Sequence, residues 1–152
     1  MSELPLRIRD FKDEDFEALC RIDRICFPKD IAFSVHDFRS YLNHPDHLVR
    51  IAEESGQVIG FILALMEKDS CVHVMTLDVL PEFRRQCIGS LLMDALHEET
   101  GRRGITTAIL EVSCFNLPAQ RLYRKLHYKN IGTLPGYYSA KEDAYCMIRI
   151  MK

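Results

Sequence analysis

Apolar side chains recur along the chain with two different spacings. Alternation with polar residues, or a short apolar run between turn residues, predicts a β-strand, whereas a spacing of three to four residues predicts a helix with one buried face. The strand pattern covers residues 6–10, 47–54, 57–66, 71–80, 105–112, 128–133 and 144–150. The helical pattern covers residues 16–26, 35–42 and 88–100, and a last helix is expected after Asn116.

Three of the predicted helices follow residues that are typical of helix starts. Asp13, Ser34 and Asn116 can each cap the next helix with a side-chain oxygen, and Pro118 suits the first turn after Asn116. The resulting order is β-α-α-β-β-β-α-β-α-β-β. This order predicts an α/β (α+β) protein, with a mixed central sheet of about seven strands and about four helices packed on it. The chain of 152 residues is expected to form a single domain, 1–152.

Charge and cysteine content narrow the classes of partner. The chain has 20 basic and 22 acidic residues, so no summed positive charge is available to hold a nucleic acid. No apolar run approaches the roughly 18 residues of a membrane span, and the first residues lack the apolar stretch of a signal peptide. The six cysteines include no Cys-x-x-Cys pair, so we expect reduced thiols in a cytoplasmic protein. Residues 44–47, His-Pro-Asp-His, form a proline-broken loop without further ligands, and we expect no metal site there.

Residues 77–96 carry a strand, a turn and a helix start in succession. The amides of a helix's first turn are unpaired and the helix dipole adds a partial positive charge, so this arrangement can hold a phosphate. Arg84 and Arg85 add cationic donors, and Gly89 leaves room for a bulky group to approach the backbone. The same spacing also fits a plain helix start with two solvated arginines, so the residues alone leave both interpretations open.

Three segments together resemble one enzyme superfamily. The first resembles the acetyl-CoA signature of the GCN5-related N-acetyltransferases (GNAT) and reads LPEFRRQCIGSLL, with Cys87 where the first signature glycine is usual. The second resembles the family's next block and reads LEVSCFNLPAQRLYRKLHY, with His127 and Tyr128 in place of Gly-Phe. The third, LPGYYSAKEDAYCMI, resembles the end of a narrower branch, the protein N-terminal α-acetyltransferases, which includes the ribosomal-protein alanine acetyltransferases. The resemblance covers nearly the whole chain and implies the GNAT fold.

The resemblance implies acetyl-CoA as the acetyl donor and no metal. The pantetheine arm would pair with the backbone of one strand, and the pyrophosphate would lie on the amides of the following turn. The implied acetyl-CoA contacts are Leu77, Asp78, Val79, Arg84, Arg85, Gln86, Cys87, Ile88, Gly89, Ser90, Asn116 and Tyr123. The N–H of Val79 would polarise the thioester carbonyl. A phosphate needs only the N–H of Cys87, so we expect this residue in the ordinary right-handed conformation.

The same resemblance implies a base and an acid. Glu111 is the candidate base, because its strand neighbours face the other way and leave it free to point into a cleft. Tyr123 matches the acid that would protonate the CoA thiolate, and His73, on the preceding strand, is a second candidate base. Without the resemblance, a solvated strand carboxylate, a core tyrosine and a packed histidine would explain the same residues.

The expected acceptor is the α-amine of a protein or peptide N-terminus. A free α-amine has a pKa of about 7.7 to 8.0, so a substantial fraction is neutral near pH 7 and a modest base suffices. Phe27 and Pro28 resemble one wall of the acceptor site, and Tyr137 and Tyr138, expected in a connection between strands, resemble its acceptor loop. A GNAT enzyme for a small amine, such as a polyamine or an antibiotic, and a non-catalytic acyl-CoA-binding module are the alternatives. We expect a monomer or a weak homodimer.

Overall fold

The computed structural model describes residues 5–151, and the predicted order of elements and the fold class are confirmed. The strands are β1 (Arg7–Asp10), β2 (His47–Glu54), β3 (Gln57–Glu67), β4 (Cys71–Val79), β5 (Thr107–Ser113), β6 (Lys129–Ser139) and β7 (Glu142–Ile150). The helices are α1 (Phe16–Cys26), α2 (Val35–Asn43), α3 (Ile88–Arg102) and α4 (Leu117–Lys125), with short 3-10 turns at η1 (Asp13–Asp15) and η2 (Pro81–Phe83). None of these helices is long and apolar enough to cross a lipid bilayer.

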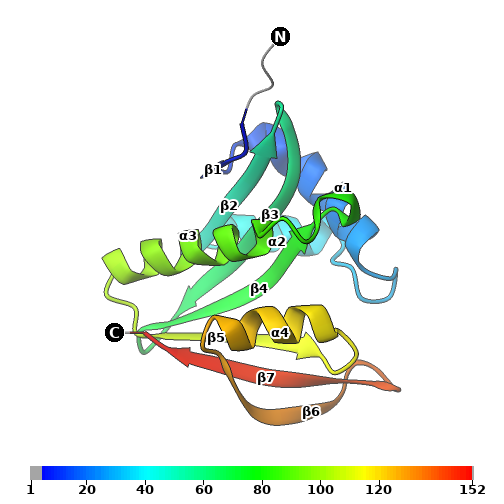
Figure 1. Ribbon diagram of the computed structural model, residues 1–152, viewed down its shortest axis with the longest axis vertical. Helices are drawn as coiled ribbons and strands as arrows, with labels where there is room; N and C mark the ends of the chain where they lie inside the picture. The colour runs from blue at the N-terminus through cyan, green and yellow to red at the C-terminus, as the bar shows by residue number, and fades with distance from the viewer. Residues whose placement is uncertain (1–4, 152) are drawn as a thin grey trace.

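The strands form one sheet with helices on both faces. Its order is β1-β2-β3-β4-β5-β7-β6, and each neighbouring pair is antiparallel except β4 and β5. Figure 1 shows α3 crossing β2, β3 and β4 on the near face, with α4 beside β5, whereas α2 lies behind the sheet. Helix α1 packs on β3 and β4. The central strands are therefore held between two layers of helices.

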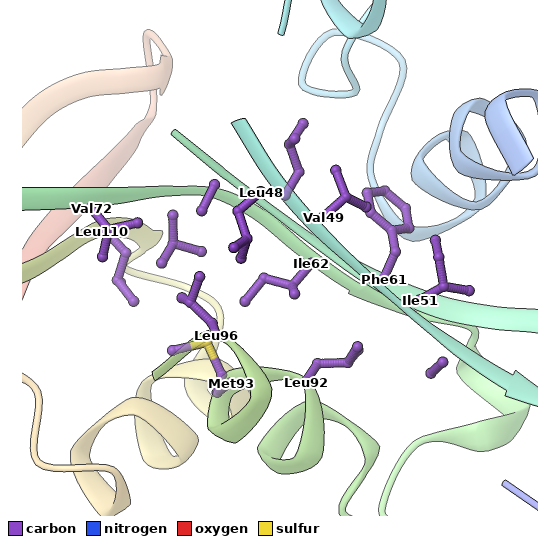
Figure 2. Packing of buried hydrophobic residues seen from close by; sticks show 14 of the residues in the cluster. Leu48, Val49, Ile51, Phe61, Ile62, Val72, Leu92, Met93, Leu96 and Leu110 are labelled. Atoms are coloured by element: carbon purple, nitrogen blue, oxygen red, sulfur yellow. The ribbon is translucent and has the colours of Figure 1, made fainter. Parts of the chain in front are cut away.

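Alternating strand residues build a core on each face of the sheet. Figure 2 shows Leu92, Met93 and Leu96 of α3 on one side of the strands, the side to which Ile62 points, while Phe61, the preceding residue of β3, points to the other. All five side chains are fully buried. Each contributes about 1.5–3 kcal/mol relative to an exposed side chain. This packing fixes the central strands, which carry the candidate site.

Strands β4 and β5 separate in the middle of the sheet. They pair in parallel over Cys71–Val74 and Thr107–Leu110, and the ladder ends there. Strand β4 also carries a bulge at Met75, which the ladder with β3 skips. A bulge bends its strand and increases the local twist. The two strands therefore diverge as a fork, and Glu111 is the first residue of β5 beyond their last pair.

The helix caps agree with the sequence at two of three positions. Ser34 and Asn116 cap α2 and α4, because each side chain accepts a hydrogen bond from a backbone amide of the first turn. The prediction that Asp13 caps α1 is wrong, since Asp13 begins the turn η1 and the helix starts after Asp15. The carboxylate of Asp15 accepts two hydrogen bonds from Arg9 at 2.8 and 2.9 Å, and this buried pair joins the helix start to β1.

Strand β6 extends further than the sequence pattern, which predicted a strand over residues 128–133. Tyr137 and Tyr138 lie within β6 and not in a connection between strands, because this strand continues to Ser139. The register shifts between Leu134 and Ser139, so the strand passes Pro135 through an irregularity rather than ending there. Both tyrosines therefore lie in β6, in the stretch between its last two paired positions, Leu134 and Ser139.

Candidate active site

A cavity of about 410 Å³ opens where β4 and β5 diverge. Its walls come from both strands, from α4, from the connection between α1 and α2, and from the end of β6. The lining includes Phe27, Pro28, Thr76, Leu77, Glu111, Asn116, Tyr123 and Tyr138. A second cavity of about 290 Å³ adjoins it, since several residues, Glu111 among them, line both. Most of the side chains predicted to act on the amine and thioester therefore meet at one place.

The turn between β4 and α3 presents free backbone amides. Cys87 occupies the N-cap position of α3, and no side chain caps the first turn there. The prediction of a right-handed Cys87 is wrong, because its φ of 63° and ψ of 17° are left-handed. Arg85 also has a positive φ, of 66°. Positive φ values in such a turn aim successive N–H groups to one side, as in anion-binding nests, so Cys87 adopts a strained conformation that costs about 1–2 kcal/mol.

The two arginines of the turn differ in their contacts. Arg84 donates from Nε to the carbonyl of Val79 at 3.0 Å, which ties the turn to the end of β4. Its other guanidinium N–H groups stay available for an anion. The side chains of Arg85 and Gln86 are exposed. The turn thus offers one anchored and one exposed guanidinium beside the free amides.

Gly89 serves the packing of the helices, which corrects the interpretation from sequence. A Cβ at this position would lie 3.2 Å from Cδ2 of Leu122 on α4 and 3.8 Å from Cδ2 of Leu77 on β4. The space that the missing side chain leaves is therefore turned inward. Glycine lets the start of α3 approach α4 and β4 closely, and this close approach sets where the free amides lie.

The amides of Leu77 and Val79 are oriented toward the fork. The N–H of Leu80 donates to Ile59 on β3 at 2.9 Å. Because successive amides along a strand point to opposite sides, those of Leu77 and Val79 point away from β3. The carbonyl of Val79 also faces away from β3, where it accepts from Arg84 and from the thiol of Cys26 at 3.4 Å. The predicted oxyanion donor, the N–H of Val79, is thus directed at the open side of β4.

His73 and Glu111 are brought together across β4 and β5. Nε2 of His73 lies 2.7 Å from Oε1 of Glu111. Hydrogen bonding to Glu111 raises the pKa of His73 above its ordinary value, against the opposing effect of burial. Glu111 lines both cavities, whereas His73 lines neither. The geometry therefore favours Glu111 as the group that meets an amine, with His73 behind it.

Tyr123 and Asn116 reach the cavity from α4. Tyr123 packs against Tyr128, with ring centroids 5.9 Å apart, and burial raises the pKa of its phenol, so the hydroxyl is protonated at neutral pH. Oδ1 of Asn116 accepts from the amide of Ala119 at 3.2 Å, which leaves its amide nitrogen free to donate. The cap and a ligand contact are therefore compatible roles for Asn116.

Aromatic side chains form the wall on the acceptor side. Phe27 and Tyr138 line both cavities, Pro28 lines the first and Tyr137 the second. The hydroxyl of Tyr138 donates to the carbonyl of Glu111 at 3.2 Å, and that of Tyr137 to its carboxylate at 3.4 Å. Burial, assisted by the charge of Glu111, raises the pKa of Tyr137 to about 12. Both tyrosines thus join the acceptor wall to the candidate base.

A pair of buried carboxyl groups beside the cavities was not predicted from the sequence. Asp23 of α1 and Asp78 of β4 are 1% and 0% exposed. Asp23 accepts from the amide of Phe33 at 2.7 Å and Asp78 from the hydroxyl of Thr76, while one oxygen of each has no donor. Burial, and then the neighbouring carboxyl of Asp23, raise the pKa of Asp78 well above its ordinary value, which favours the protonated form of Asp78. The available signal was a carboxylate inside the apolar run TLDVL.

Comparison with known proteins assigns most of the chain to one family. Residues 16–128 match the acetyltransferase (GNAT) family. The chain belongs to the GNAT family. It is 30% identical over 153 residues to an N-alpha-acetyltransferase of Sulfurisphaera tokodaii, and the match covers 93% of this chain and 90% of that one. The solved structure of Ard1 from Thermoplasma volcanium is similar with a TM-score of 0.90 and 26% identity, over 98% of this chain and 99% of that one.

Family membership makes this GNAT protein an N-acetyltransferase with acetyl-CoA as the acetyl donor. The same fold occurs in NAA60 of Arabidopsis thaliana in complex with acetyl-CoA, with a TM-score of 0.84 and 23% identity over 95% of this chain and 98% of that one. The residues present fit such a donor, because the start of α3 has no side-chain cap and β4 has amides directed at the fork. Among residues 5–151, no group of three or more His, Cys, Asp or Glu side chains is arranged to hold a metal ion.

Proposed function

We propose that this GNAT enzyme acetylates the α-amine of protein or peptide N-termini. The observation that carries the proposal is the position of Glu111 where the two cavities meet, held by His73 on one side and by Tyr137 and Tyr138 on the other. An amine that enters through the second cavity would reach the Glu111 carboxylate next to the open edge of β4. The name of the Sulfurisphaera tokodaii relative, N-alpha-acetyltransferase, supports this acceptor.

The second cavity suits the first side chain of a peptide. Its lining is largely aromatic and apolar and includes Phe27, Ile31, Phe33, Tyr41 and Met75, with Asp30 among the polar groups. The tyrosine hydroxyls of β6 donate to Glu111, and each can accept a hydrogen bond from a peptide N–H. Contacts to the peptide backbone would accept many N-termini, and the aromatic lining would select among them. We therefore expect moderate selectivity for the first residue.

The proposed chemistry is direct attack of the amine on the thioester. Glu111 accepts the proton of the amine, directly or through a water, as the nitrogen forms a bond to the carbonyl carbon. The N–H of Val79 stabilises the oxygen that becomes negative, and the carbon–sulfur bond then breaks to release the CoA thiolate.

Tyr123 donates a hydrogen bond to the leaving thiolate. A thiol has a pKa of about 8.5, below even an ordinary phenol at about 10, and burial raises the pKa of Tyr123 further. Complete proton transfer from Tyr123 is therefore unfavourable. Its role is to stabilise the thiolate until solvent supplies the proton.

Three acceptors test the proposal: a peptide with a free N-terminus, the same peptide blocked at its α-amine but carrying lysine, and a polyamine. Labelled acetyl-CoA would report the kcat/KM for each. The free N-terminus should be preferred, and Tyr138→Ala should raise the peptide KM or lower kcat. If the blocked peptide or the polyamine is acetylated more efficiently, the acceptor is a different class of amine. Unchanged constants in Tyr138→Ala would remove Tyr138 from the acceptor site.

A further inference from the structure

Three ionisable side chains form a hydrogen-bonded row across the central strands. Glu67 at the end of β3, His73 on β4 and Glu111 on β5 are in direct contact in that order. Nδ1 of His73 lies 3.2 Å from Oε1 of Glu67, and Nε2 lies 2.7 Å from Oε1 of Glu111. The Glu67 side chain is 52% exposed, whereas those of His73 and Glu111 are 21% and 14% exposed. This row of side chains thus runs from solvent to Glu111, which lines both cavities.

The contacts determine where hydrogens must lie on the ring. An ionised carboxylate only accepts hydrogen bonds, so each ring nitrogen of His73 must carry a hydrogen to satisfy the oxygen it faces. A ring with both hydrogens is a cation, and a cation suits a site between two carboxylates. The raised pKa of His73 agrees with this state, since Glu111 and then Glu67 favour the charged ring and burial opposes it.

The charged groups that face His73 are these two carboxylates, from the strands on either side of β4. Tyr137 of β6 and Cys146 of β7 lie close to Glu111. Neither Glu67 nor His73 lines either of the two cavities, so neither would touch an acceptor bound there. An effect of Glu67 on the reaction must therefore pass through His73.

We infer that Glu67 is a positioning residue that holds His73 with a hydrogen on both nitrogens, so that Nε2–H always donates to Glu111 and keeps its carboxylate aimed at the acceptor amine. Without Glu67, a neutral ring can carry its hydrogen on Nδ1 and present a lone pair to Glu111. That tautomer repels the carboxylate and leaves it without its donor. The inference rests on the proposed function, because it assigns Glu111 as the base.

The test compares three variants. Glu67→Ala removes the charge and the contact, Glu67→Gln removes the charge but keeps a polar group beside Nδ1, and Asp69→Asn removes one charge from the same turn without touching His73. Asp69 has a φ of 64°, which asparagine tolerates, so this control should fold normally. Two quantities are measured for each: the pKa of His73 by NMR of the ring, without substrate, and the separate kcat and KM for a peptide acceptor.

In Glu67→Ala, the pKa of His73 should fall further than in Asp69→Asn. The kcat should fall about 3- to 30-fold, a part of the 10²–10⁴-fold that a positioned base contributes, with KM values within about twofold. Glu67→Gln should recover part of the kcat. An equal pKa in Glu67→Ala and Asp69→Asn, or an unchanged kcat, overturns the inference. If the wild type acetylates no peptide, the proposed function fails, while the NMR titration still decides whether Glu67 holds His73 protonated.

Discussion

Replacing Cys87 with glycine should stabilise the protein although it removes a side chain. The left-handed conformation of Cys87 costs a non-glycine residue about 1–2 kcal/mol. Its side chain is exposed and caps nothing, so its removal deletes no buried contact. Against this, glycine makes the unfolded chain freer by about 0.4–1 kcal/mol. The difference predicts that Cys87→Gly raises the free energy of unfolding by about 0.8 kcal/mol, within about 0 to 1.6 kcal/mol.

Thermal and urea unfolding can resolve a change of this size. For a domain of about 150 residues, 0.8 kcal/mol corresponds to a rise in Tm of about 2–3 °C. Cys87→Ala is the matched control, since it removes the thiol but keeps the strained backbone. If Cys87→Ala is as stable as Cys87→Gly, the left-handed strain does not explain the effect, and the account of this turn is wrong.

Two further variants test the site beyond the turn. Tyr123→Phe removes the hydrogen bond to the thiolate and should lower kcat about 10- to 1000-fold with little change in acetyl-CoA binding, as measured by steady-state kinetics and calorimetry. A kcat within about twofold of wild type, with chemistry rate-limiting, would assign the side chain to packing. Asp78→Asn tests the raised pKa of Asp78. Because the folded pKa of Asp78 lies above the unfolded value of about 3.9, unfolding releases a proton, and stability falls as pH rises from the unfolded pKa through the folded pKa. Urea unfolding as a function of pH should show the variant gaining stability relative to wild type as pH rises, and a constant difference would contradict the raised pKa.

Much of the architecture could be predicted from the sequence because apolar spacing reports burial directly. The order of strands and helices follows from that spacing, and the Ser34 and Asn116 caps follow from residue type. The prediction that Tyr137 and Tyr138 lie in a connection between strands was wrong. Pro135 and Gly136 suggest a break, whereas an irregular ladder lets β6 continue. Pairing with β7 on either side of this stretch, at Leu134 and Ser139, keeps it within the strand.

The sequence offered candidate site residues one by one, but not the contacts between them. The resemblance implied Glu111 and His73 as candidate bases, yet their contact depends on where the parallel ladder between β4 and β5 ends. Asp23 and Asp78 are distant in sequence, so only the packing of α1 on β4 brings the two carboxyls together. The conformation of Cys87 could not be predicted from its residue type. The turn requires a positive φ at this position, although cysteine disfavours it.

One competition experiment tests the central claim most directly. A single peptide with both a free α-amine and an internal lysine is incubated with acetyl-CoA and enzyme, and mass spectrometry of fragments locates the acetyl group. The account predicts acetylation of the α-amine in large excess over lysine, and a drop in kcat of about 10²–10⁴-fold in Glu111→Gln, which keeps the shape of the side chain but not its basicity. Acetylation mainly on lysine, or full activity of Glu111→Gln, would contradict the account.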